Sequence, residues 1–178
     1  MVLRRRSPGG PPVTVSRTRR APHPVRERLA RALAWHDAHV SFDDAVKGLA
    51  PRLRGQRPRG TAHSVWELVD HIRRAQHDIL DFCRNPSYTP HTWPDDYWPP
   101  EPAPSSAAEW NAALDAIRRD RRALQRIARD RSRGLETRIP HGDGQTYLHE
   151  ILLAIDHASY HVGQIVALRE RLGAWPAR

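Results

Sequence analysis

The sequence predicts an all-α protein, built as an antiparallel four-helix bundle. Four long stretches repeat apolar residues at the three- and four-residue spacing of an amphipathic helix. No stretch of useful length shows the two-residue alternation of a half-buried strand. A chain of 178 residues is long enough for one domain with its own core. Helices that each bury one apolar face pack most economically as a bundle.

The first predicted helix runs from about Val25 to Asp37 and carries apolar residues at helical spacing. A shorter helix is predicted over Phe42–Leu49, because the Ser41 side chain can cap its N-terminus. The following residues, 51–60, are rich in Pro, Gly and Arg and are therefore predicted to be a connector.

The second long helix is predicted from Ser64 to Arg84. Ser64 and Glu67 have the spacing of a capping box, and Asn85-Pro86 marks the end of the helix. On a helical wheel its apolar residues form one buried arc, and His71 lies at the edge of that arc.

Residues 86–104 are rich in proline and also contain Tyr88, Trp93, Tyr97 and Trp98. So many prolines exclude a regular helix or a central strand. The sequence therefore predicts a long loop between the second and third long helices, and its aromatic residues indicate that it packs against the helices.

The third long helix is predicted from Ser106 to Asp130, with Glu109 as the capping-box partner of Ser106. A turn-rich connector follows over residues 131–145. The fourth long helix begins after Thr146 and ends at Gly173, since glycine is the usual residue just past a helix C-terminus.

Charge divides the chain into a tail, residues 1–22, and a bundle domain, residues 23–178. The tail holds six arginines and no acidic residue, which is typical of a disordered basic segment. Removing those six charges from the formal net charge of +9 leaves +3 for the rest. The sequence shows no known nucleic-acid-binding module, so we expect no specific nucleic-acid binding by the folded domain.

The N-terminus lacks the apolar run of a signal peptide, and no stretch approaches 18 apolar residues. We therefore expect a cytoplasmic protein that does not span a membrane.

Cys83 is the only cysteine, which excludes a disulfide framework and a cysteine-based zinc site. Its place on the apolar side of its helix favours a small buried residue over a nucleophile.

Three histidines are candidate metal ligands. His157 and His161 are four residues apart, so they lie on one face of the fourth long helix, at the margin of its buried arc. His71 lies at the matching margin of the second long helix, and a bundle can bring the two helices together. Three neutral imidazoles leave positions open on a metal ion, as in catalytic sites. The alternative is that each histidine is half-buried and hydrogen-bonded.

Two helical segments resemble signatures of the DinB-like superfamily: His63 to Ile72 in the second long helix, and Asp156 to Ile165 in the fourth. The second segment contains the pattern His-x-x-x-His-x-Gly-Gln. The resemblance extends over roughly residues 25–175 and does not include the tail.

The resemblance implies a four-helix bundle in which His71, His157 and His161 hold a divalent metal, with Zn²⁺ or Ni²⁺ as the expected ion. The superfamily includes metal-dependent hydrolases and enzymes that use low-molecular-weight thiols as cosubstrates. It thus implies a small-molecule substrate for this chain, and either hydrolysis or thiol transfer as the reaction.

Two other functions are compatible with the sequence. One is a non-catalytic metal-binding stress-response module, whose metal pocket would be closed by Trp93, Tyr97 and Trp98. The other is nucleic-acid association through the arginine-rich tail. A homodimer is also compatible with the sequence, because bundles with exposed apolar helix faces often pair.

Overall fold

The fold consists of helices joined by irregular segments. The computed structural model describes residues 23–34 and 37–175. Within those ranges the backbone forms five α-helices, two 3-10 turns (Pro51–Leu53 and Asp95–Tyr97) and no strand longer than a single bridge. The predicted all-α class is therefore confirmed. The helices are α1 (Pro24–Ala32), α2 (Phe42–Val46), α3 (Val65–Arg84), α4 (Ala107–Arg129) and α5 (Tyr147–Arg171).

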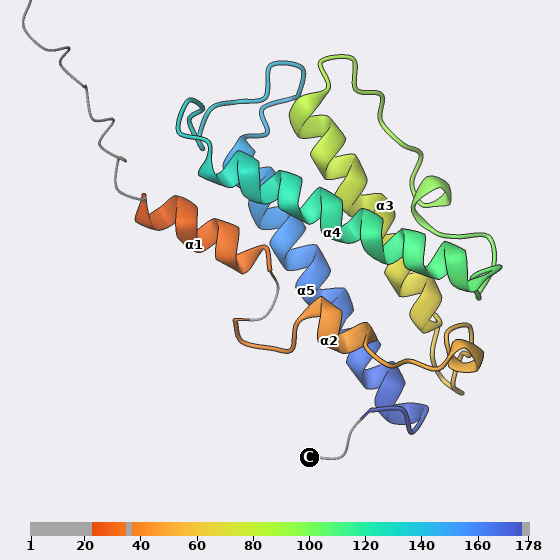
Figure 1. Cartoon of the computed structure of the whole chain (residues 1–178). Coiled ribbons are helices and arrows are strands. Elements are labelled where there is room, and N and C mark those ends of the chain that lie inside the picture. Colours follow the sequence, from red (N-terminus) through yellow and green to blue (C-terminus); the bar gives the residue numbers. More distant parts are fainter. Residues whose placement is uncertain (1–22, 35–36, 176–178) are drawn as a thin grey trace, which may run out of the picture.

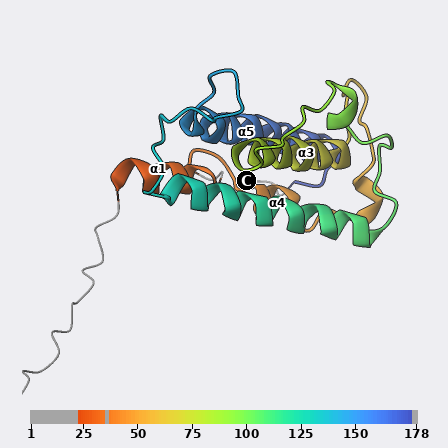
Figure 2. The same cartoon turned by 90° about the horizontal axis from the view of Figure 1, so that it is seen from above.

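The long helices are arranged in two layers. Figure 1 shows α3 and α5 side by side, with the chain running in opposite directions along them. Seen from above in Figure 2, α3 and α5 form one layer, and α1 and α4 form the other. The 3-10 turn Asp95–Tyr97, in the proline-rich loop, packs against α3. This arrangement places the loop beside the α3–α5 pair.

Polar side chains cap the starts of α2, α3, α4 and α5, but the predicted capping box of Ser106 and Glu109 is incomplete, because Glu109 Oε2 accepts from the Ser105 N–H instead. The Glu67 backbone N–H donates to Ser64 Oγ at 3.1 Å, and the Ser64 N–H donates to Glu67 Oε2 at 2.7 Å, which completes the capping box of α3. The side chains of Ser41, Ser106 and Thr146 accept the equivalent bonds at the starts of α2, α4 and α5. These caps fix where the helices that carry the site begin.

The two N-terminal helices are shorter than predicted. α1 ends at Ala32 instead of near Asp37, although its apolar pattern continues to the fully buried Leu33. α2 ends at Val46 instead of Leu49, because Gly48 adopts a left-handed conformation with φ of +69°. Apolar spacing reports which residues are buried, and burial can continue past the last helical turn. The predicted disordered tail, residues 1–22, lies outside the described residues.

Helix α5 is long and apolar enough to cross a membrane by length and composition alone, with a mean hydropathy of 1.3 over its most apolar window. The sequence analysis did not expect any such segment. One helix of this kind is weak evidence for a membrane, because the core helix of a globular domain passes the same test. Ile151, Val162 and Ile165 of α5 are fully buried in the core.

Arg26 of α1 closes the C-terminal end of α4. Its guanidinium donates to the carbonyl oxygens of Ala128 at 3.0 Å, Asp130 at 2.6 Å and Arg133 at 2.5 Å. Arg26 is nearly buried, and the last carbonyls of a helix have no partner within it. The Arg26 side chain thereby links α1 to the C-terminal end of α4.

We expect Arg26→Ala to lower the free energy of unfolding by about 3 kcal/mol, since it leaves three carbonyl groups without their charged donor. Chemical denaturation followed by circular dichroism measures the change. Arg28→Ala is the matched control, because Arg28 is largely exposed and its ion pair is with the likewise exposed Asp37. Equal losses in the two variants would contradict this role of Arg26.

Candidate metal centre

The structure brings three imidazole rings together between α3 and α5. His71 comes from α3, and His157 and His161 come from successive turns of α5. One nitrogen atom of each ring lies within 4.8 Å of the others. The ring centroids are 4.8 Å apart for His71 and His157, 4.7 Å for His71 and His161, and 4.5 Å for His157 and His161. Among the described residues, this is the group of metal-ligating side chains that could hold an ion.

The helix geometry accounts for this meeting. Four residues turn an α-helix by slightly more than a full turn, so His157 and His161 project from the same face of α5. The neighbouring helix α3 presents His71 to that face. His71 is only 2% exposed and His161 only 7% exposed, while His157 is partly buried. The sequence predicts all three histidines at the margin of the core. In the structure, His71 and His161 are buried more deeply than a marginal position implies.

In the rings of His71 and His161, a hydrogen bond to one nitrogen atom determines that the other nitrogen is available to a metal. His71 Nδ1 lies 2.9 Å from the carbonyl oxygen of Tyr97, and His161 Nδ1 lies 2.7 Å from Gln164 Oε1. Both partners are acceptors, so each Nδ1 carries the proton and each neutral ring leaves its Nε2 lone pair free. Outer partners of this kind orient the histidine ligands of metal sites.

His71 Nε2 points directly at His157 Nε2, at a distance of 2.9 Å. Two imidazole nitrogens that converge in this way inside a bundle, with a third ring beside them, provide the donor set that Zn²⁺ and Ni²⁺ prefer. The residues present therefore fit a divalent ion held by three nitrogen ligands.

Burial keeps the three rings uncharged. Desolvation lowers the pKa of His157 from 6.5 to about 3, and the neighbouring His161 and His71 add to the shift. Desolvation also lowers the pKa of His161 to about 4, although its bond with Gln164 opposes the shift. The pKa of His71 is lowered as well, mainly by desolvation. All three are neutral at physiological pH, which is the form that binds a metal.

The aromatic loop covers His71. The Trp98 ring lies flat between two imidazoles, with centroids 4.0 Å from His71 on one side and 4.0 Å from His63 on the other. The predicted packing of the loop aromatics is thus found for Trp98, whereas Trp93 is 67% exposed. His63 lies just before the N-cap residue of α3. Nothing in the apolar spacing of the sequence indicates its stacking on Trp98, because His63 precedes the helix.

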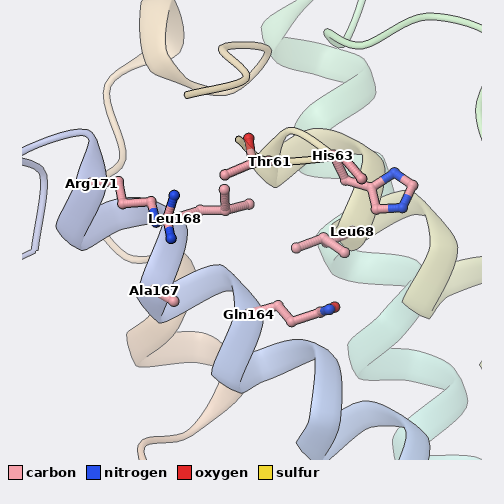
Figure 3. A pocket seen from close by; sticks show the side chains of 8 residues that line it. Thr61, His63, Leu68, Gln164, Ala167, Leu168 and Arg171 are labelled. Carbon is pink, nitrogen blue, oxygen red and sulfur yellow. The ribbon is translucent and has the colours of Figure 1, made fainter. Parts of the chain in front are cut away.

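A cavity of about 220 Å³ lies next to Gln164, the hydrogen-bond partner of His161. Figure 3 shows Gln164, Ala167 and Leu168 of α5 on one side of it, and Leu68 of α3 and His63 on the other. Gln164 lines this cavity and also bonds to His161. A molecule in the cavity would therefore be next to the histidine cluster, and the Arg171 side chain also lines the cavity.

Other polar or titratable side chains of α3 and α5 lie outside the cluster. Cys83 is buried, and desolvation raises the pKa of its thiol to about 12, which excludes a thiolate nucleophile at neutral pH. His77 is mostly exposed and lies 3.0 Å from the Asp120 carboxylate. Asp156 is exposed beside His157.

A family model described as the DinB superfamily matches residues 34–165. The match spans well over half of the 178 residues and contains His71, His157 and His161. The resemblance drawn from the two helical motifs is thereby confirmed. No curated protein and no solved structure matches the chain.

Proposed function

The chain belongs to the DinB superfamily, whose members are often metal-dependent, and we propose on this basis that it is a metalloenzyme that uses a low-molecular-weight thiol as cosubstrate. His71, His157 and His161 hold one divalent ion, Zn²⁺ or Ni²⁺. The helices α1, α3, α4 and α5 correspond to the four helices of the family's antiparallel bundle.

One observation carries the metal assignment. His71 and His161 have their Nδ1 protons committed to fixed acceptors, which leaves their Nε2 atoms available, and His71 Nε2 lies 2.9 Å from His157 Nε2. A hydrogen bond from His157 can satisfy His71 Nε2 alone, whereas one nitrogen of each of the three rings lies within 4.8 Å of the others. A bound cation gives these lone pairs a partner.

The side chains around the cluster favour thiol chemistry over hydrolysis. Among the described residues, the cluster contains three neutral imidazoles and no carboxylate that could act as a general base toward water. A bound divalent ion lowers the pKa of a coordinated thiol so far that it ionises at neutral pH without a separate base. His71, His157 and His161 stay uncharged and therefore remain available as ligands.

The adjoining cavity supports an enzyme rather than a closed binding module. His63, Gln164 and Arg171 contribute polar groups to a cavity that is otherwise lined by Leu68, Ala167 and Leu168. A small electrophile can be held there by apolar contact and oriented by those polar groups. In the reaction, the thiol sulfur forms a bond to the electrophilic carbon, whose leaving group departs with the electron pair.

The proposal predicts metal-dependent thiol consumption. Zinc- or nickel-loaded protein is incubated with 1-chloro-2,4-dinitrobenzene and a panel of thiols that includes cysteine and glutathione, and free thiol is titrated over time. We expect at least one thiol to react about 100-fold faster than without protein. His161→Ala should abolish the increase, whereas His149→Ala, an exposed position on α5, should retain it. Metal-dependent ester hydrolysis that needs no thiol would instead identify a hydrolase.

A further inference from the structure

A second cavity, of about 370 Å³, lies at the other end of the α3–α5 pair. Its walls come from the second half of α3, the first turn of α5, the start of the proline-rich loop and the connector before α5. Its lining residues with polar or aromatic side chains are Asp78, Phe82, Tyr88, His141, Asp143, Gln145 and Glu150. It shares no lining residue with the first cavity, and none of the three clustered histidines lines it, so it goes beyond the function proposed above.

Glu150 is a buried carboxyl group for which no residue in the described ranges provides a hydrogen-bond donor. The residue is 5% exposed and lines the cavity. The closest basic atom to its carboxylate, among the described residues, is His149 Nε2 at 3.9 Å, which is too far for a hydrogen bond. Desolvation raises the pKa of Glu150, and the charge of Asp78 raises it further, while His149 opposes the shift. A buried carboxyl group in this state is stabilised by a cation beside it.

Asp78 adds a second carboxylate that no arginine or lysine neutralises within the cavity. It accepts hydrogen bonds from the hydroxyl groups of Tyr88 at 2.8 Å and Tyr97 at 2.7 Å. Its nearest basic partner is His91 Nε2, at 3.7 Å. The cavity lining contains three acidic residues and no arginine or lysine, although the whole chain has a formal net charge of +9. The cavity is therefore negative within a basic protein.

Aromatic rings form the apolar part of the wall. The rings of Phe82 and Tyr88 meet edge to face at 5.1 Å, and the ring of His141 lies 5.2 Å from Phe82. His141 is itself held by a 2.8 Å contact with the Phe82 carbonyl oxygen. Aromatic faces next to carboxylates attract organic cations through their quadrupoles.

A metal ion fits this cavity less well than an organic cation. Among the described residues, the ligand atoms of the three histidines converge, whereas the carboxylates of Asp78, Asp143 and Glu150 do not form such a set. An ion such as Mg²⁺ or Ca²⁺ needs several oxygen ligands around one point. An ammonium group needs only hydrogen-bond acceptors on one side, and its organic part can contact Phe82 and Tyr88.

We propose that this cavity binds a small organic amine in its ammonium form, with the charge at Glu150 and Asp78 and the apolar body against Phe82 and Tyr88. Its volume is within the range of small-molecule pockets. The cavity is tied to the histidine cluster by Tyr97, whose carbonyl oxygen accepts from His71 while its hydroxyl donates to Asp78.

Isothermal titration calorimetry with three probes of similar shape tests the charge preference on the wild-type protein. We expect benzylamine to bind at least tenfold more tightly than benzyl alcohol, and benzoate to show no binding. Equal affinity for the amine and the alcohol would overturn the proposal. Tight binding of Ca²⁺ or Mg²⁺ that benzylamine cannot displace would also overturn it, in favour of a metal site.

Two variants test the location. Glu150→Gln keeps the size of the side chain and should weaken benzylamine binding at least tenfold, whereas Glu170→Gln, an exposed position on the same helix, should leave it unchanged. Unchanged binding in Glu150→Gln contradicts the assignment. The probe comparison on wild-type protein holds even if this variant folds poorly. The amine titration is repeated with and without bound Zn²⁺. We expect amine binding in both cases, so this test does not depend on whether the metal proposal is correct.

Discussion

Replacing His157 with alanine is expected to abolish stoichiometric metal binding. His157 Nε2 lies 2.9 Å from His71 Nε2, in the middle of the candidate ligand set. Two imidazoles that remain after the substitution make a site with too few protein ligands to retain an ion during purification. We expect the affinity for Zn²⁺ to fall by about three orders of magnitude, since each lost ligand removes several kcal/mol of binding energy.

Elemental analysis of protein purified without an affinity tag, followed by a competition titration with a chromophoric chelator, measures this effect. His161→Ala should behave in the same way. His149→Ala changes an exposed histidine on the same helix and should keep one metal ion per chain. Stoichiometric metal in both His157→Ala and His161→Ala would rule out the proposed site.

The metal-free protein is expected to lose roughly 5 kcal/mol of stability between pH 6.5 and pH 4. Desolvation lowers the pKa of His157 to about 3 and that of His161 to about 4, whereas both groups titrate near 6.5 in an unfolded chain. Below pH 6.5 the unfolded chain therefore binds protons that the folded protein does not. The contribution of these residues to stability is complete above that pH and is lost as the pH falls toward 4.

Denaturant titrations of chelator-treated protein at several pH values measure the slope. In the range from pH 6.5 to 4.5 the carboxyl groups with lowered pKa values, such as Glu67 and Asp43, stay ionised in the folded protein, whereas Glu150, whose pKa is raised by desolvation, contributes a slope of the opposite sign. His157→Gln removes one titrating group and should reduce the slope. A flat stability profile across this range in the wild-type protein is the result that contradicts the expectation.

The sequence predicted most of the helical framework, because its signals are local. Ser64 and Glu67 form the capping box that their spacing indicates, and the long helices begin within one residue of the expected positions. The early end of α1 at Ala32 was not predictable from periodicity, since Leu33 continues the apolar pattern while leaving the helix.

The candidate site was only partly accessible from the sequence. The helical spacing of His157 and His161 is a local property, and the family motif adds His71. The backbone carbonyl of Tyr97 that accepts from His71, and the stacking of His63 on Trp98, depend on how the proline-rich loop returns to α3. Contacts of this kind have no sequence pattern.

The sequence also contains a spacing pattern that indicates where the second cavity lies. Asp78 follows His71 by seven residues on α3, and Glu150 precedes His157 by seven on α5. Seven residues bring a helix back to nearly the same face, and the two helices run in opposite directions. The two acidic residues are therefore expected at one end of the pair, about 10 Å along the helix axes from the histidines.

The contact between His71 and His157 joins positions 86 residues apart in the chain. An ion bound to both closes a loop of that length, as a disulfide does, and restricts the unfolded ensemble. For a loop of this size the chain-entropy estimate is about 4.6 kcal/mol. Unlike a disulfide, such a link forms and breaks with the supply of the ion. The lifetime of the folded protein would thus follow the concentration of free metal around it.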